Sequence, residues 1–266
     1  MAGLTVDGVA VASYVVDPHH VDVRDGRRPY LHPVRTLAGV PVTDAAPADH
    51  TWHLGASLAM QDVGGTNLWG GRTYVRGEGY TWRDDHGEIA HTGWLPAEEG
   101  LAQRLEWRDP AGTVLLTEER RVTASPAPLG WRLSFDFTLS AAGNDVALGS
   151  PATNGRPGGA GYGGFFWRAA PGTAETFTAD AEGEERVNGS AAPWVALTGP
   201  GPYTLVFQGL AGDDRWFVRT GIYPGVCAAL AFERPLVVTA ETPVVRRVRV
   251  LVADGRLSRD EVAGAV

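Results

Sequence analysis

One segment, residues 131–139, limits the possible folds more than any other part of the sequence. It reads Trp-Arg-Leu-Ser-Phe-Asp-Phe-Thr-Leu, so apolar and polar residues alternate without interruption. A period of two places the aromatic and aliphatic side chains on one face of a β-strand and the polar ones on the other. We therefore expect a strand with one buried face and one face in contact with water.

Similar strand-like segments recur along the chain and are bounded by Gly, Pro, Asp and Asn. The clearest are Leu101 to Trp107, Val114 to Val122, Tyr203 to Gln208, Trp216 to Arg219 and Val244 to Ala253. The 35 glycines and 18 prolines fit many tight turns between such strands. The pattern predicts an all-β fold, a large antiparallel β-sandwich.

Helical signals are confined to the C-terminal tail, where Ser258 and Glu261 have the spacing of a capping box and predict a short C-terminal helix. No change in composition marks a linker within residues 1–266, and sandwiches commonly reach about 200 to 250 residues as one unit. We therefore expect a single β-sandwich domain over residues 1–266.

Charge and residue types exclude several functions. The net charge of −8 opposes binding to nucleic acid and to anionic membranes. All basic residues are arginine, which excludes lysine Schiff-base chemistry. Cys227, the one cysteine, lies in an apolar run that favours a buried structural thiol.

The N-terminus lacks a signal-peptide pattern and no run reaches the ~18 apolar residues of a membrane helix, so we expect a cytoplasmic protein.

Polar residues with catalytic potential are densest between Arg28 and Arg72. Imidazole transfers protons near neutral pH and also binds divalent metals. The candidate catalytic residues are His53, His50, Arg35 and His32. Two interpretations stay open besides catalysis: the histidines form hydrogen bonds to loop carbonyls, or they bind a divalent metal together with oxygen ligands. No cofactor is predicted with certainty.

Candidate sugar-binding residues are aromatic, amide, basic or acidic side chains, several of them in loop-like settings. Indoles stack on the apolar faces of sugar rings, while Arg, Asn and His bind hydroxyl groups. The candidates are Trp52, Asn67, Trp69, His91, Glu119, Tyr162, Arg168 and Trp194. Core packing for the tryptophans, an ion pair for Glu119 and a structural role for the isolated His91 are the alternatives.

Several segments, in consistent order over nearly the whole chain, resemble the PmoA-like family of bacterial proteins, which is labelled methane oxygenase PmoA. The segments are residues 28–33, 49–55, 67–71, 161–168, 192–194 and 215–219. The resemblance implies a sandwich similar to the large galactose-mutarotase-like sandwiches. It also implies an association with sugar oxidoreductases and sugar isomerase-like proteins, which points to oxidised sugars or glycosides.

The expected function is that of a carbohydrate-active enzyme, a lyase or hydrolase acting on a glycoside or keto-glycoside. Beside a ketone, a base such as His53 or His50 can remove a ring proton, and Arg35 can stabilise the enolate. A mutarotase or epimerase is a variant. A non-catalytic sugar-binding or accessory protein of a sugar oxidoreductase pathway and a cupin-like metal oxygenase are the alternatives. The expected partner is a small-molecule carbohydrate, and a homo-oligomer stays open.

Overall fold

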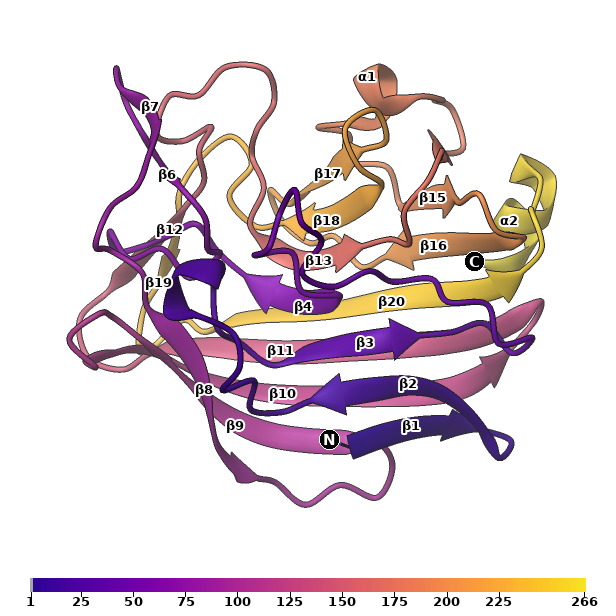
Figure 1. The fold of residues 1–266 in the computed structure, drawn as a ribbon, viewed down its shortest axis with the longest axis horizontal. Coiled ribbons are helices and arrows are strands. Elements are labelled where there is room, and N and C mark those ends of the chain that lie inside the picture. The colour runs from indigo at the N-terminus through magenta and orange to yellow at the C-terminus, as the bar shows by residue number, and fades with distance from the viewer. Residues whose placement is uncertain (1) are drawn as a thin grey trace.

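A computed structural model describes residues 2–266, in which strands form two large antiparallel sheets packed face to face (Figure 1). The first sheet has seven strands in the order β1 (Ala2–Val6), β2 (Val9–Val15), β3 (Tyr30–Val34), β4 (Ala56–Ala59), β13 (Gly164–Arg168), β18 (Gly225–Ala229) and β17 (Arg215–Arg219). The predicted all-β sandwich is therefore confirmed.

The second large sheet contains the longest strands of the described residues. Its eight strands follow the order β14 (Glu175–Phe177), β15 (Trp194–Thr198), β16 (Tyr203–Gln208), β20 (Val244–Asp254), β11 (Gly130–Ala141), β10 (Val114–Ala127), β9 (Leu101–Arg108) and β8 (Glu88–Trp94). In β11 buried and half-buried residues alternate along the whole strand, as the period of two predicts.

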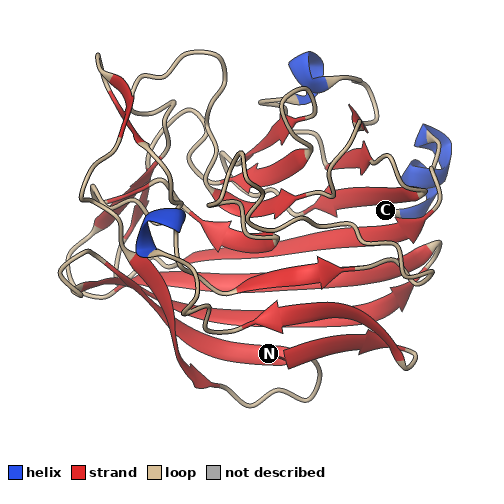
Figure 2. Ribbon diagram, in the orientation of Figure 1, coloured by secondary structure: helices blue, strands red, loops and turns tan. Residues whose placement is uncertain are grey.

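Smaller elements lie at the margins of the sandwich, where the few helices are also found (Figure 2). A three-stranded sheet joins β19 (Leu236–Val238), β12 (Val146–Gly149) and β5 (Asp62–Val63), and β6 (Thr73–Val75) pairs with β7 (Gly79–Thr81). The helices are η1 (Val23–Asp25), α1 (Glu184–Val187) and α2 (Arg259–Ala265). The predicted capping box forms at the start of α2, between Ser258 and Glu261.

Aromatic side chains join the two sheets across the core. The ring of Phe135 on β11 lies 4.7 Å from that of Phe165 on β13, and Trp167 on β13 lies 5.7 Å from Phe207 on β16. The indole N–H of the buried Trp167 donates to a backbone carbonyl at 2.9 Å. Among the described residues, no helix is long and apolar enough to cross a membrane.

A charged pair is enclosed between the sheets. Adjacent residues of a strand point to opposite faces, so Glu118 and Arg120 of β10 face the core while Glu119 faces outward. The Arg120 Nε donates to the Glu118 carboxylate at 2.6 Å. Arg120 also donates to the Tyr14 hydroxyl of the opposite sheet at 2.9 Å, and the Trp107 indole donates to Glu118 at 2.8 Å. Each charge therefore has partners that offset its burial.

We expect Glu118→Leu to lower the free energy of unfolding by about 3 to 5 kcal/mol, because it leaves the buried Arg120 guanidinium without a counterion. The double variant Glu118→Leu with Arg120→Met should be less destabilised, because neither charge remains. Chemical denaturation measures both. Glu119→Leu, one residue away on the exposed face, is the control and should change stability by about 0.5 kcal/mol or less. Equal losses in the single and double variants would contradict the pairing.

Candidate functional site

The outer face of the first sheet carries the candidate site. Phe165 and Trp167 point into the core, so the intervening Phe166 and the following Arg168 point to the opposite face of β13. Phe166 joins a second, smaller apolar cluster there, together with Trp69, Phe217, Cys227, Ala59, Ala229 and Phe232. Cys227 is buried as predicted, and burial raises the pKa of its thiol to about 12.

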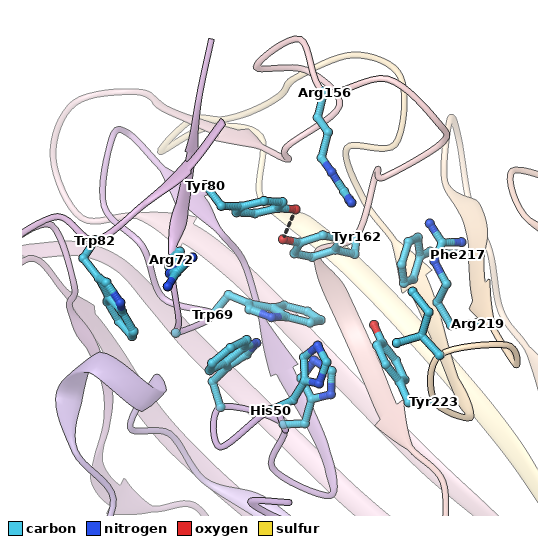
Figure 3. Close-up of a pocket in the computed structure, with 14 residues that line it drawn as sticks. His50, Trp69, Arg72, Tyr80, Trp82, Arg156, Tyr162, Phe217, Arg219 and Tyr223 are labelled. Carbon is cyan, nitrogen blue, oxygen red and sulfur yellow. Dashed lines mark hydrogen bonds between the residues drawn. The ribbon is translucent and has the colours of Figure 1, made fainter. Parts of the chain in front are cut away.

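A cavity of about 440 Å³ opens above this cluster (Figure 3). Aromatic rings, two histidines and three arginines line it, and none of the described lining residues is an aspartate or glutamate. The lining residues are His50, Trp52, His53, Trp69, Gly70, Arg72, Tyr80, Trp82, Arg156, Tyr162, Phe217, Arg219, Ile222 and Tyr223. Of the predicted site residues, the structure brings together His50, His53, Trp52, Trp69 and Tyr162 in this lining.

Arg28 fixes two of the loops that line the cavity, those of Trp52 and Trp69. Its buried Nη1 donates to the backbone carbonyls of Gly26 and Trp69 at 2.7 and 3.0 Å. Nη2 donates to the carbonyl of Trp52 at 3.0 Å, and Nε donates to the Ser57 hydroxyl of β4 at 3.0 Å. Burial lowers the pKa of Arg28 to about 9, so it stays charged at neutral pH and its hydrogen bonds are charge-assisted.

Asn67 shapes the loop that carries Trp69. The Asn67 Oδ1 accepts from the backbone N–H groups of Trp69 and Gly70, both at 2.9 Å, and its Nδ2 donates to the Thr73 hydroxyl at 2.9 Å. The side chain is fully buried and does not line the cavity. The prediction that Asn67 contacts sugar is therefore corrected: its polar atoms are occupied within the loop.

The Trp52 indole lies directly on the backbone of Gly71. The φ of Gly71 is +69°, and a Cβ at this position would come within 2.7 Å of the Trp52 ring. Glycine is therefore required here both for the left-handed backbone and for the close approach of the indole. This packing makes Trp52 one wall of the cavity.

His50 is held by a carboxylate. Its Nδ1 lies 2.7 Å from the Asp49 Oδ2. Because an ionised carboxylate only accepts, the Nδ1–H donates and the neutral ring keeps the lone pair of Nε2 free. The hydrogen bond from His50 is the largest of the effects that hold the pKa of Asp49 below its usual value. His50 is thus oriented as a proton acceptor at the cavity.

His53 lies against His50 with the opposite proton placement. The two rings stack at 4.6 Å and 20°. Arg168 Nη1 lies 3.2 Å from the Nδ1 of His53, and a guanidinium only donates, so Nδ1 accepts and the neutral ring carries its proton on Nε2. Burial, together with the charges of His50, Arg168 and Arg28, lowers the pKa of His53 well below its usual value. His53 is therefore a neutral hydrogen-bond donor.

Arg168 supports the histidines from behind the cavity lining. Its guanidinium lies 4.6 Å from the centre of the Tyr223 ring, and its Nη2 is 3.8 Å from the Asp49 carboxylate. Arg168 was predicted to bind substrate, but it is buried and does not line the cavity, so it acts through His53 and Asp49.

Two tyrosines close the cavity on the side of the β6–β7 hairpin. The hydroxyl groups of Tyr80 and Tyr162 lie 2.8 Å apart, as the dashed line in Figure 3 marks, and Gln61 Nε2 donates to the Tyr162 hydroxyl at 3.0 Å. Burial raises the pKa of both tyrosines. Their hydroxyl groups are therefore neutral donors at physiological pH.

Two predicted catalytic residues lie outside the cavity. The Nδ1 of His32, on β3, lies 3.0 Å from the Thr43 hydroxyl, and Arg35 donates to the carbonyl of Gly39 at 3.2 Å. Neither side chain lines the cavity. Proximity to His50 and His53 in the sequence did not place them together, because β3 runs within the sheet while the two histidines lie in a loop above it.

Three predicted sugar-binding residues also lie elsewhere, on strands of the second sheet. His91 on β8 hydrogen-bonds to a glutamine of β9 at 2.9 Å. Glu119 is exposed and pairs with Arg104 at 3.6 Å. Trp194 is buried in a separate apolar cluster beneath α2 and packs edge-on against Phe177. These placements match the structural alternatives: a strand histidine, an ion pair and core packing.

Five further cavity residues were not predicted from the sequence: Arg72, Arg156, Arg219, Tyr80 and Tyr223. They come from separate hairpins and loops, and the sole signal was the presence of arginine beside glycine-rich or aromatic segments.

A metal site was the other open question. Within residues 2–266, no group of three or more His, Cys, Asp or Glu side chains is placed to hold a metal ion.

We expect Gly71→Ala to lower the free energy of unfolding and to change the near-ultraviolet circular dichroism of tryptophan, because the added Cβ collides with Trp52. Gly77→Ala is the matched control: Gly77 also has a positive φ, +84°, but nothing lies within 4 Å of an added Cβ. Backbone strain of about 1 kcal/mol is common to both variants, so the excess loss in Gly71→Ala measures the collision. Equal losses would contradict it.

His53 predicts a pH dependence of stability. Below its ordinary pKa the unfolded chain binds a proton at this residue, while the folded protein, with its lowered pKa, stays neutral. Above about pH 6.5 His53 therefore does not reduce the free energy of unfolding. Below that pH, its effect lowers the free energy of unfolding by up to about 1.4 kcal/mol per pH unit. Between about pH 7 and pH 5, the wild type should lose more stability than His53→Gln in chemical denaturation. Equal losses would count against a neutral His53.

A search of curated proteins finds no match to the chain. Residues 2–266 match the model of a protein family described as a family of unknown function, DUF6807. The match covers both sheets and every residue of the cavity. The chain therefore belongs to the family DUF6807.

Proposed function

We propose that the protein is a carbohydrate-active lyase that removes a proton from a ring carbon beside a carbonyl group. The observation that carries the proposal is the pair of stacked imidazoles with opposite proton placement. At the cavity, His50 presents an acceptor nitrogen and His53 presents an N–H donor. Abstraction of such a proton requires both: a base for the proton and a donor for the oxygen that becomes an enolate.

The chemical step uses these groups as follows. The Nε2 of His50 takes the proton, and the C–H electron pair moves to form the enolate, whose oxygen accepts a hydrogen bond from the Nε2–H of His53. The electron pair of the enolate then forms a carbon–carbon double bond as the C–O bond at the β-carbon breaks. The leaving oxygen takes up the proton that His50 carries. Asp49 stabilises the charged His50 between these steps.

Elimination is favoured over hydrolysis by the composition of the cavity. Glycoside hydrolases with the usual mechanism need two carboxyl groups on either side of the bond they cleave. Among the described lining residues there is no carboxyl group. The lining does contain the base and the neutral donor that an elimination requires.

A sugar ring fits the walls of the cavity. Trp52 and Trp69 present indole surfaces, and Trp82 adds a half-exposed indole at the rim. Indoles bind the C–H faces of sugars, while tyrosine hydroxyls bind sugar hydroxyls. The volume, about 440 Å³, is within the usual range for small-molecule sites and exceeds the need of one monosaccharide.

The test incubates the protein with keto-glycosides and glycuronides in deuterated water. We expect the signal of the ring proton beside the carbonyl to disappear from nuclear magnetic resonance spectra, with deuterium at that carbon in substrate that is reprotonated from the enolate, and ultraviolet absorbance from the conjugated product. His50→Gln should lower the rate by about a hundredfold or more, the usual contribution of a general base. Glu119→Gln, on the opposite sheet, is the control and should keep the full rate.

The other outcomes separate the alternatives. Full turnover in both His50→Gln and His53→Gln would refute the assignment. Exchange that inverts the configuration of the ring carbon without loss of a leaving group would identify an epimerase. Ligand-induced stabilisation without exchange or turnover would identify a non-catalytic sugar-binding protein; at a hundredfold excess over the dissociation constant it amounts to ~2.7 kcal/mol.

A further inference from the structure

The charge of the cavity contrasts with that of the whole molecule. The chain has a net charge of −8, yet the described lining of the cavity contains three arginines and no carboxylate. Neutral sugars need no such excess of positive charge, because hydroxyl groups bind equally well to amide and carboxylate side chains. The three arginines therefore bear on the charge of the ligand.

Arg156 projects from the loop before β13 toward the two tyrosines (Figure 3). Its guanidinium lies 4.9 Å from the centre of the Tyr80 ring. Within the described residues, no carboxylate lies within 4.0 Å of Arg156 or of Arg72, which lines the opposite side. Stacking fixes the plane of the Arg156 guanidinium and leaves its in-plane N–H groups able to donate to a ligand.

Arg219 is held in a similar way. Its guanidinium lies 4.2 Å from the centre of the Phe217 ring, and its Nη1 donates to the carbonyl of Val218 at 2.8 Å. Glu184 approaches Nη1 at 3.5 Å, but the other oxygen of this carboxylate accepts from the backbone N–H groups of Thr220 and Gly221. The charge of Arg219 is thus only partly offset.

A second hollow of about 740 Å³ adjoins the cavity and shares Arg156, Arg219 and Ile222 with it. Its other lining residues are Gly158, Gly159, Glu184, Glu185, Asn188 and Gly221. The two arginines therefore stand at the junction between two hollows. A ligand that extends from the cavity into the second hollow passes both of them.

We infer that the ligand is a carbohydrate with an anionic group, a carboxylate or a phosphate, which Arg156 and Arg219 bind at this junction. The inference rests on the proposed function for the sugar and on the arginines for the charge. A guanidinium binds a planar carboxylate or a phosphate through paired N–H groups. A uronate also suits the elimination, because neutralising its carboxylate makes the neighbouring ring proton more acidic.

Isothermal titration calorimetry tests the inference with D-glucuronate, D-galacturonate and D-glucose 6-phosphate against D-glucose and D-galactose. We expect at least one anionic sugar to bind about tenfold or more tightly than its neutral parent, and less tightly as salt is added. Arg156→Gln and Arg219→Gln should each lose about tenfold in that affinity. Arg104→Gln, an exposed arginine of the second sheet, should change nothing.

Preference for the uronates identifies a carboxylate, and preference for the sugar phosphate identifies a phosphate. Binding of neutral sugars alone, binding of none of the panel, or an anion affinity that both cavity variants retain would overturn the inference. Anion binding without turnover that depends on His50 would leave the inference standing and refute the proposed lyase. Turnover of neutral keto-glycosides without anion preference would support the proposed lyase and overturn the inference of an anionic ligand.

Discussion

The candidate site depends on one buried guanidinium. Arg28 has no carboxylate partner among the described residues and instead bonds to three backbone carbonyls and a serine hydroxyl, which belong to η1's C-terminal glycine, two loops and β4. A backbone carbonyl without a hydrogen bond inside the protein costs free energy. Loss of Arg28 would therefore leave all three carbonyls and the Ser57 hydroxyl without this partner at once. The loops of Trp52 and Trp69 meet above the sheet because Arg28 lies beneath both.

The two faces of the first sheet differ: one packs into the core and the other carries the candidate site. Alternation along β13 sends Phe165 to the inter-sheet core and Phe166 to the apolar cluster beneath the cavity. The core face packs against the second sheet, which contains the longest strands of the described residues. The outer face is covered by loops with many positive-φ glycines, which a chain needs where backbone and indole approach closely. A rigid sheet thus supports a site built from irregular segments.

The sequence predicts the sheets better than the site, for a physical reason. A strand is encoded locally, by a period of two as in β11 or by a short apolar run bounded by turn residues as in β16, and so both could be recognised from their own residues. The loop of His50 and His53 was also recognisable, because its residues are adjacent. The positions of Arg156 and Arg219 follow from strand pairing between distant segments, which no local pattern encodes. Trp194 was misassigned because an indole that follows a proline at the start of a strand looks the same in the sequence whether it faces solvent or a helix.

The asymmetry of the two imidazoles follows from the donor and acceptor character of their neighbours. Asp49 can only accept and Arg168 can only donate, so rings that stack at 4.6 Å are forced into opposite tautomers. Arg168 also lies 3.8 Å from Asp49, which ties the two partners into one network. When His50 takes up a proton, Asp49 stabilises the added charge, while burial and Arg168 keep His53 neutral. The neighbours thus leave His50 as the imidazole that can accept a proton and His53 as a hydrogen-bond donor.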